Sequence, residues 1–194
     1  MRQEKSFFPD YHTKQMNDTF AYFNEFMNKS QSTKSFNLKK CIDNSIDILR
    51  PLLQNNHIMV CSSCQNIDVF SCESEMTLAL LNILNNSFFE LTKNETQKER
   101  YIHIESKRSE NNSLKITIQD TRKLAPAISQ TIFEQYDNTY ENRNSFDMRL
   151  LISKKIIEQS LKGKLDVQIE PLVLNGKKID SCKFTIELIE SFLQ

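Results

Sequence analysis

The chain has 194 residues, 25 basic and 25 acidic side chains, and 39% hydrophobic residues. This length can bury one sizeable core, and no apolar run approaches the roughly 20 residues of a membrane span. A net charge of zero without a basic block argues against a dedicated nucleic-acid binder. No apolar stretch follows the N-terminus as in a secretory signal, so we expect a cytoplasmic chain without membrane contact.

Glycine and cysteine are the informative residue types. The chain has 2 glycines, where average usage of about 7% predicts around 13, so a glycine-rich phosphate loop is disfavoured. The 5 cysteines, an odd number without an export signal, indicate reduced thiols. Cys61 and Cys64 form a CxxC pair, which could hold zinc only if the fold brought Cys72 and Cys182 close. Free thiols are the favoured interpretation.

The N-terminal part is expected to contain two helices separated by a polar loop. Apolar residues at helical spacing predict a helix over 16–27, and residues 28–35 are expected to form the loop. Asn37 is placed to cap a second helix, whose apolar stripe runs from Leu38 to Leu53. Pro51 lies late in this helix and is expected to kink or end it.

The central part is expected to contain two pairs of strands around a helix. Short apolar runs at 57–60 and 67–70 predict the first strand pair. The helix is expected from Glu75 to Leu91, and because it is apolar almost all round it should be buried on more than one side. Alternating apolar residues at 102–104 and 114–118 predict a hairpin.

The C-terminal part opens with a long polar segment, 120–145, of a length that is usually functional or disordered inside a compact domain. Helical periodicity returns over 146–161, and Gly163 is placed to end that helix. A last hairpin is predicted to pair 165–169 with 182–188. The order of elements favours an α/β fold, a two-layer sandwich in which three helices cover one face of a mixed sheet of five to six strands.

Three polar residues are candidates for chemistry. Asn82 and Asn86 lie four residues apart on the predicted helix, so their carboxamides share one face. Asp120 ends an apolar strand and opens the long segment. Taken alone, the two asparagines are better interpreted as a solvated polar edge, and an acid at a turn is common.

The surrounding sequence blocks reverse that interpretation. Residues 78–91, LALLNILNNSFFEL, resemble the asparagine box of the sensor histidine kinases, whose ATP-binding domain has the Bergerat (GHKL) fold. The segment ITIQD resembles the start of that family's first glycine box, and TIFEQY its phenylalanine box. Residues 150–167 resemble the helix and strand after the second glycine box. The blocks follow the family order over roughly residues 16–190.

The resemblance also implies a division of the chain. Residues 16–42 resemble the end of the second dimerisation helix and the start of the ATPase domain. We therefore expect residues 1–35 to be a remnant of that helix with a linker. Residues 36–194 are then a histidine-kinase-type ATPase-like domain.

The resemblance gives each candidate residue a role. Asn86 would coordinate Mg²⁺, for which a carboxamide oxygen is a suitable ligand. Asn82 would lie beside the phosphates as the catalytic residue that positions the reacting groups. Asp120 would accept a hydrogen bond from the adenine amino group, and Phe133, in the phenylalanine box, is the fourth nucleotide-binding residue. The implied cofactors are ATP and Mg²⁺.

Both glycine boxes depart from the family pattern. Arg122 and Leu124 stand where the family has glycines, which puts long side chains where adenine should lie. Residues 145–150 replace the second glycine box, and Asp147 there would face a triphosphate with like charge at a helix N-terminus. None of the 3 histidines has the sequence context of the family's phosphoacceptor.

These departures favour a histidine-kinase-like signalling domain of a two-component system with a degenerate ATP site, a pseudokinase that acts mainly through protein contacts. Its kinase activity would be weak or absent. The alternative is a functional catalytic domain that phosphorylates a histidine outside this chain. A histidine phosphotransferase is a third interpretation, but it lacks the phosphoacceptor. The expected partners are a response-regulator receiver domain, a histidine-kinase dimerisation domain or a second copy of the chain.

Overall fold

The computed structural model describes residues 32–93, 99–109, 113–122, 148–174 and 176–188. The chain divides into two compact units, 1–32 and 33–194, and nearly all described residues belong to the second. The helix predicted at 16–27, most of the loop predicted at 28–35 and the segment 123–147 lie outside the described residues. Among the helices that are described, none is long and apolar enough to cross a membrane.

A mixed five-stranded sheet forms one layer of the fold. Its strand order is β2-β4-β5-β9-β6. The β2–β4 pair is parallel and the other three pairs are antiparallel. The strands are β2 (Met59–Cys64), β4 (Tyr101–Arg108), β5 (Leu114–Asp120), β6 (Lys164–Ile169) and β9 (Cys182–Leu188).

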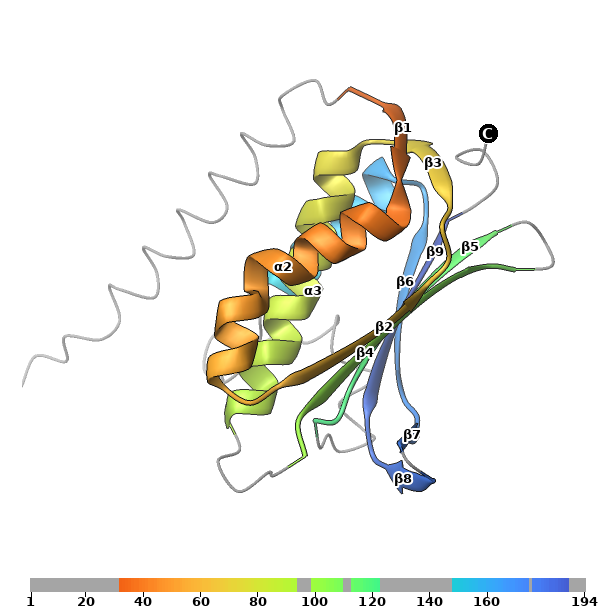
Figure 1. Cartoon of the computed structure of the whole chain (residues 1–194). Coiled ribbons are helices and arrows are strands. Elements are labelled where there is room, and N and C mark those ends of the chain that lie inside the picture. The colour runs from red at the N-terminus through yellow and green to blue at the C-terminus, as the bar shows by residue number, and fades with distance from the viewer. Residues whose placement is uncertain (1–31, 94–98, 110–112, 123–147, 175, 189–194) are drawn as a thin grey trace, which may run out of the picture. The chain divides into compact units, whose positions relative to one another are not determined.

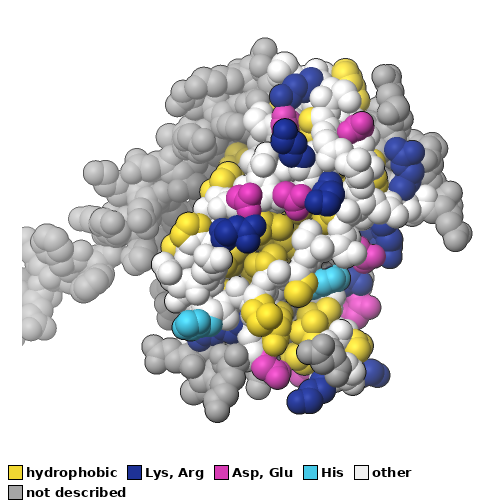
Figure 2. Space-filling view, in the orientation of Figure 1, with side chains coloured by type: hydrophobic (Ala, Val, Ile, Leu, Met, Phe, Trp, Pro, Cys, Tyr) yellow, Lys and Arg dark blue, Asp and Glu magenta, His cyan; other side chains and the backbone are white. Residues whose placement is uncertain are grey.

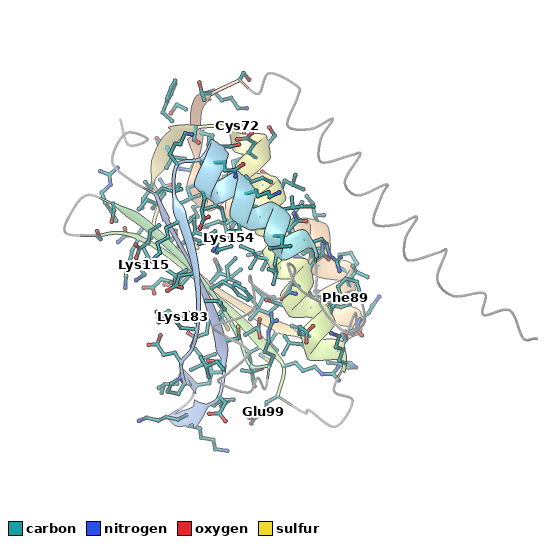
Figure 3. All side chains as sticks on the ribbon, turned by 180° about the vertical axis from the view of Figure 1, so that it is seen from behind. Cys72, Phe89, Glu99, Lys115, Lys154 and Lys183 are labelled. Atoms are coloured by element: carbon teal, nitrogen blue, oxygen red, sulfur yellow. The ribbon has the colours of Figure 1, made fainter. Side chains whose placement is uncertain are left out.

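Three helices form the second layer, on one face of this sheet (Figures 1 and 3). They are α2 (Leu38–Asn55), α3 (Glu73–Lys93) and α5 (Met148–Lys155), which continues into a π-helical turn, η1 (Ile156–Ser160). The core lies between the layers, where most of the large apolar side chains of α3, β4 and β5 are buried. The predicted two-layer α/β sandwich is confirmed.

Helix α2 begins where its sequence predicts. The side chain of Asn37 accepts a hydrogen bond from the backbone N–H of Lys40 at 3.0 Å, which satisfies one of the free donors of the first turn. The apolar stripe from Leu38 to Leu53 is buried. Pro51 does not end the helix at once, since the helix continues to Asn55.

The strands predicted at 57–60 and 67–70 do not pair with each other. β2 pairs with β4, whereas β3 (Asp68–Ser71) pairs antiparallel with β1 (Lys34–Asn37). The expected loop at 28–35 is therefore wrong at its end. The pairing of β1 with β3 has a packing reason, because Phe36 and Val69 lie opposite each other and both are buried.

The two later hairpins are confirmed. β4 pairs with β5, with Ile104 opposite Ile118, and β6 pairs with β9, with Val167 opposite Phe184. The connection between β6 and β9 contains a small hairpin that the sequence did not predict, β7 (Leu172–Leu174) with β8 (Lys177–Ile179). Gly176, in its turn, has φ of +78°, a conformation that favours glycine.

Gly163 follows the third helix, as predicted, but for a different reason. The left-handed residue there is Lys162, with φ of +50°. A Cβ atom on Gly163 would lie 2.6 Å from the carbonyl oxygen of Glu187 and 2.6 Å from Leu188 Cδ2. Glycine is required at this position because the chain after the helix passes against β9.

Candidate nucleotide-binding site

The structure describes three of the four predicted site residues, which lie on α3 and at the end of β5. Asn82 and Asn86 lie one turn apart on α3, and Asp120 is the last residue of β5. All three are buried, Asp120 completely. Phe133, the fourth, lies outside the described residues.

Arg122 binds the carboxylate of Asp120 from two residues away. Its Nε donates to Asp120 Oδ1 at 2.7 Å, and its Nη2 donates to Asp120 Oδ2 at 2.6 Å. The backbone N–H of Arg122 also donates to Oδ1, at 3.1 Å. Two parallel N–H···O bonds are the strongest geometry for an arginine–carboxylate pair. Both oxygens of Asp120 are therefore engaged within the chain.

The same guanidinium reaches across to α3. Nη1 of Arg122 donates to Asn86 Oδ1 at 2.7 Å, and Nη2 donates to Ser87 Oγ at 3.2 Å. The guanidinium carbon lies 5.3 Å from the centre of the Phe184 ring on β9, within the range of a cation–π contact. One buried cation thus joins α3, β5 and β9.

Burial and charge act against each other at this cluster. Burial lowers the pKa of Arg122, but the charge of Asp120 and its hydrogen bonds raise it by more, so the guanidinium stays charged. Burial raises the pKa of the neighbouring Cys182 thiol to about 12, although the charge of Arg122 opposes this shift. The cluster therefore holds one ion pair beside a neutral thiol.

The residues present do not fit ATP and Mg²⁺ in this arrangement. The oxygens that the resemblance assigns to the adenine amino group and to the metal both accept hydrogen bonds from Arg122. A Mg²⁺ ion at Asn86 Oδ1 would share that oxygen with a guanidinium and be repelled by it. A nucleotide could bind through these residues only after Arg122 had moved away.

Among the described residues, the CxxC cysteines are not part of a metal-binding cluster. Cys61 is exposed, Cys64 is half-buried, and Cys72 and Cys182 are buried, and none of the four is in a disulfide. Over the ranges that the structure describes, no group of three or more His, Cys, Asp or Glu side chains is placed to hold a metal ion.

Arg122 departs from the family pattern in the sequence, but no sequence signal indicates which residues it binds. Ser87, which accepts a hydrogen bond from Arg122, lies next to Asn86 in the asparagine box, so the sequence offers its position as a signal. Phe184 lies 62 positions after Arg122, and its sequence context indicates only a place in an alternating strand. A second arginine, Arg149, lies over the ring of Phe89 with 4.5 Å between the guanidinium carbon and the ring centre.

Comparison with known proteins places the fold. No family model matches the sequence, and no curated protein matches it either. Among solved structures, the catalytic domain of the histidine kinase ThkA is similar with a TM-score of 0.65 and 17% identity, over 82% of this chain and 96% of that one. Full-length ShkA in complex with AMPPNP gives a TM-score of 0.70 and 13% identity, over 94% of this chain and 36% of that one.

A third structure is ThkA in complex with the response regulator TrrA, with a TM-score of 0.60 and 16% identity, over 98% of this chain and 54% of that one. These similarities agree with one another and with the sheet order and helix layer described above. The chain has the fold of a histidine kinase catalytic domain.

Proposed function

We propose that this chain is a histidine-kinase-like signalling domain that acts through contacts with other proteins and does not use ATP efficiently. The observation that carries the proposal is the position of Arg122. One side chain engages Asp120 and Asn86, which correspond to the adenine-binding and metal-binding residues of the family it resembles.

The energy of the buried ion pair opposes nucleotide binding. Arg122 and Asp120 have side-chain exposures of 3% and 0%. Breaking a buried pair typically costs about 3–5 kcal/mol, and each 1.4 kcal/mol is about a tenfold change in affinity. Displacing Arg122 would therefore weaken ATP binding by roughly two to three and a half orders of magnitude.

A role in protein contact is supported by apolar side chains left exposed on the helix layer. Ile48 is 60% exposed and Leu52 46% exposed, four residues apart on α2, and hydrophobic side chains appear over α2 in Figure 2. Phe89 on α3 is 42% exposed. ThkA binds a response regulator, so a receiver domain is the first partner to test, with a histidine-kinase dimerisation domain as the second.

Calorimetry with Mg-ATP tests the proposal. We expect the full chain to show no binding in the micromolar range. Arg122→Gly should gain binding, because it frees Asp120 and Asn86 and removes the side chain that fills the space between them. Arg122→Met is the matched control, since it removes the same charge but keeps the bulk, and it should bind less well than Arg122→Gly. Micromolar binding by the unaltered chain would overturn the proposal.

The alternative is a working catalytic domain that phosphorylates a histidine outside this chain. It is favoured by the presence of Asn82, Asn86 and Asp120 at positions that match the family pattern. Incubating the chain with labelled ATP and a dimerisation domain of its own system would decide between the two. We expect no label on the histidine, and efficient transfer would establish the alternative.

A further inference from the structure

The two edges of the five-stranded sheet differ in their protection. β6, at one edge, exposes Lys164 and half-exposes Asp166, and charged side chains of this kind discourage pairing with another strand. β2, at the other edge, has the sequence MVCSSC, without a charge or a proline. Figure 1 shows β2 beside β4 at this side of the sheet. β2 is the unprotected edge.

The backbone of β2 points alternately toward β4 and away from it. Met59 N–H donates to Arg100 O at 2.9 Å, and the parallel pairing with β4 continues to Cys64. Alternation along a strand then turns the N–H and C=O groups of Val60, Ser62 and Cys64 outward. In the ladders and loops that the structure describes, these outward groups have no backbone partner.

We propose that β2 pairs antiparallel with β2 of a second copy of this chain, across a two-fold axis at Ser62. In this register Ser62 lies opposite its own counterpart, and Val60 lies opposite Cys64 of the second copy. All the outward backbone groups of both strands then find partners. The edge is its own complement about the axis, as a two-fold interface requires.

Charge and side-chain size favour a second copy as the occupant. β2 carries no charge, so two copies meet without the repulsion that like charges cause when they lie directly opposite. On the helix-covered face, half-buried Val60 would contact half-buried Cys64 of the second copy. On the open face, Cys61 would lie opposite Ser63, and both are small and exposed. No side chain of the strand obstructs the pairing.

The register is tested by an engineered disulfide in the full chain. Residues 61 and 63 would form a non-hydrogen-bonded pair, with Cα atoms about 4.5 Å apart, so a thiol introduced by Ser63→Cys should bond to Cys61 of the second copy. The substitution is made together with Cys64→Ser to remove the neighbouring thiol. Mild oxidation of mixed light-isotope and heavy-isotope chains should give a covalent dimer whose cross-link joins positions 61 and 63.

Substitutions at Ser62 provide the controls. Ser62→Pro removes the central outward N–H and leaves the ladder to β4 intact, so it should abolish the cross-link. Ser62→Ala keeps that N–H and should leave the cross-link yield unchanged. Circular dichroism of each variant reports whether the fold is retained.

Charged substitutions at Ser62 test whether the two-fold axis passes through this residue. They are made in chains that also carry Ser63→Cys and Cys64→Ser. Ser62→Asp and Ser62→Lys each place like charges opposite one another, so each variant alone should lose most of its cross-link, and the loss should be smaller at high salt. An equal mixture of the two should recover it as a mixed dimer. The proposal is overturned if the cross-link forms no better than in Ser62→Pro, or if mixing restores nothing. These outcomes do not depend on whether the chain binds ATP.

Discussion

The ion pair of Arg122 and Asp120 is more costly to break than it is favourable to form. Two opposite charges buried together gain from their attraction but lose the water that solvated them, so their net contribution to stability is small. Removing one partner leaves the other charge buried without compensation. Because Asp120 is completely buried, removal of Arg122 should strongly lower the free energy of unfolding.

A double-mutant cycle measures this dependence. Arg122→Met should lower the free energy of unfolding by about 3–5 kcal/mol, because it leaves the Asp120 carboxylate buried and unpaired. The double variant Arg122→Met, Asp120→Leu should regain most of that loss, since neither charge remains. Urea denaturation of the four chains gives the interaction energy. If the two single losses simply add, the pair does not act as a unit.

The different burial of two cysteines leads to a second prediction about single residues. Exposed Cys61 should be alkylated in the folded chain, whereas Cys182 should react only after unfolding. Burial raises the pKa of Cys182 to about 12, so at pH 9 it should remain a protonated thiol, which is not a nucleophile. Mass spectrometry of the alkylated peptides at pH 7 and pH 9 checks this. Rapid labelling of Cys182 at pH 9 would contradict its burial.

The same shift gives a pH dependence of stability. The folded-state pKa of Cys182 lies above the ordinary value of 9.0, so the proton is held more tightly in the folded chain. The contribution of this proton to the free energy of unfolding is complete below pH 9 and is lost as the pH rises toward 12. Cys182→Ala should therefore lose less stability than the unaltered chain between pH 8 and pH 10, as measured by denaturation at each pH.

At the residue level, the sequence indicates where the candidate side chains lie better than which side chains they bind. Asn86 and Asp120 were identified from their sequence blocks, and the structure brings both to one cluster. That Arg122 would bind both of them could not be predicted, because a flexible side chain can adopt many rotamers. The choice depends on Ser87 and Phe184, which belong to elements distant in the sequence.

At the level of elements, the turn after η1 depends on two adjacent residues. Gly163→Ala should destabilise the chain by about 1–3 kcal/mol, because the new methyl group would collide with backbone and side-chain atoms of β9. Lys162→Gly is the matched control. It relieves a positive φ at an exposed position and should be neutral or slightly stabilising. Thermal unfolding of both variants checks the contrast, and equal effects would contradict this account of the turn.

Elements with strong periodicity were predictable and strand partners were less so. The stripe of α2, the apolar α3 and the alternation of β4 and β5 each led to the correct element. β1 was missed because it is only four residues long and follows a polar stretch. The pairing of β2 with β4 joins residues about 40 positions apart, and no local pattern specifies which distant strand a short apolar run will join.

At the level of the whole molecule, the fold resembles that of kinase catalytic domains, whereas the side chains of the candidate site bind one another. The layers, the sheet order and the similarity to solved structures agree on the fold of a histidine kinase catalytic domain. At the end of β5, however, the oxygens of Asp120 and Asn86 accept their hydrogen bonds from Arg122 of the same chain. Charged groups elsewhere on the sheet, such as Lys115 and Lys183 in Figure 3, lie on the face away from the helices.

The most direct test is a crystal of the full chain soaked with Mg²⁺ and a non-hydrolysable ATP analogue. Our account predicts that the Arg122 guanidinium remains on Asp120 and Asn86, with no nucleotide density between these residues. Clear density for the analogue there, with the adenine amino group on Asp120 and Arg122 displaced, would contradict it.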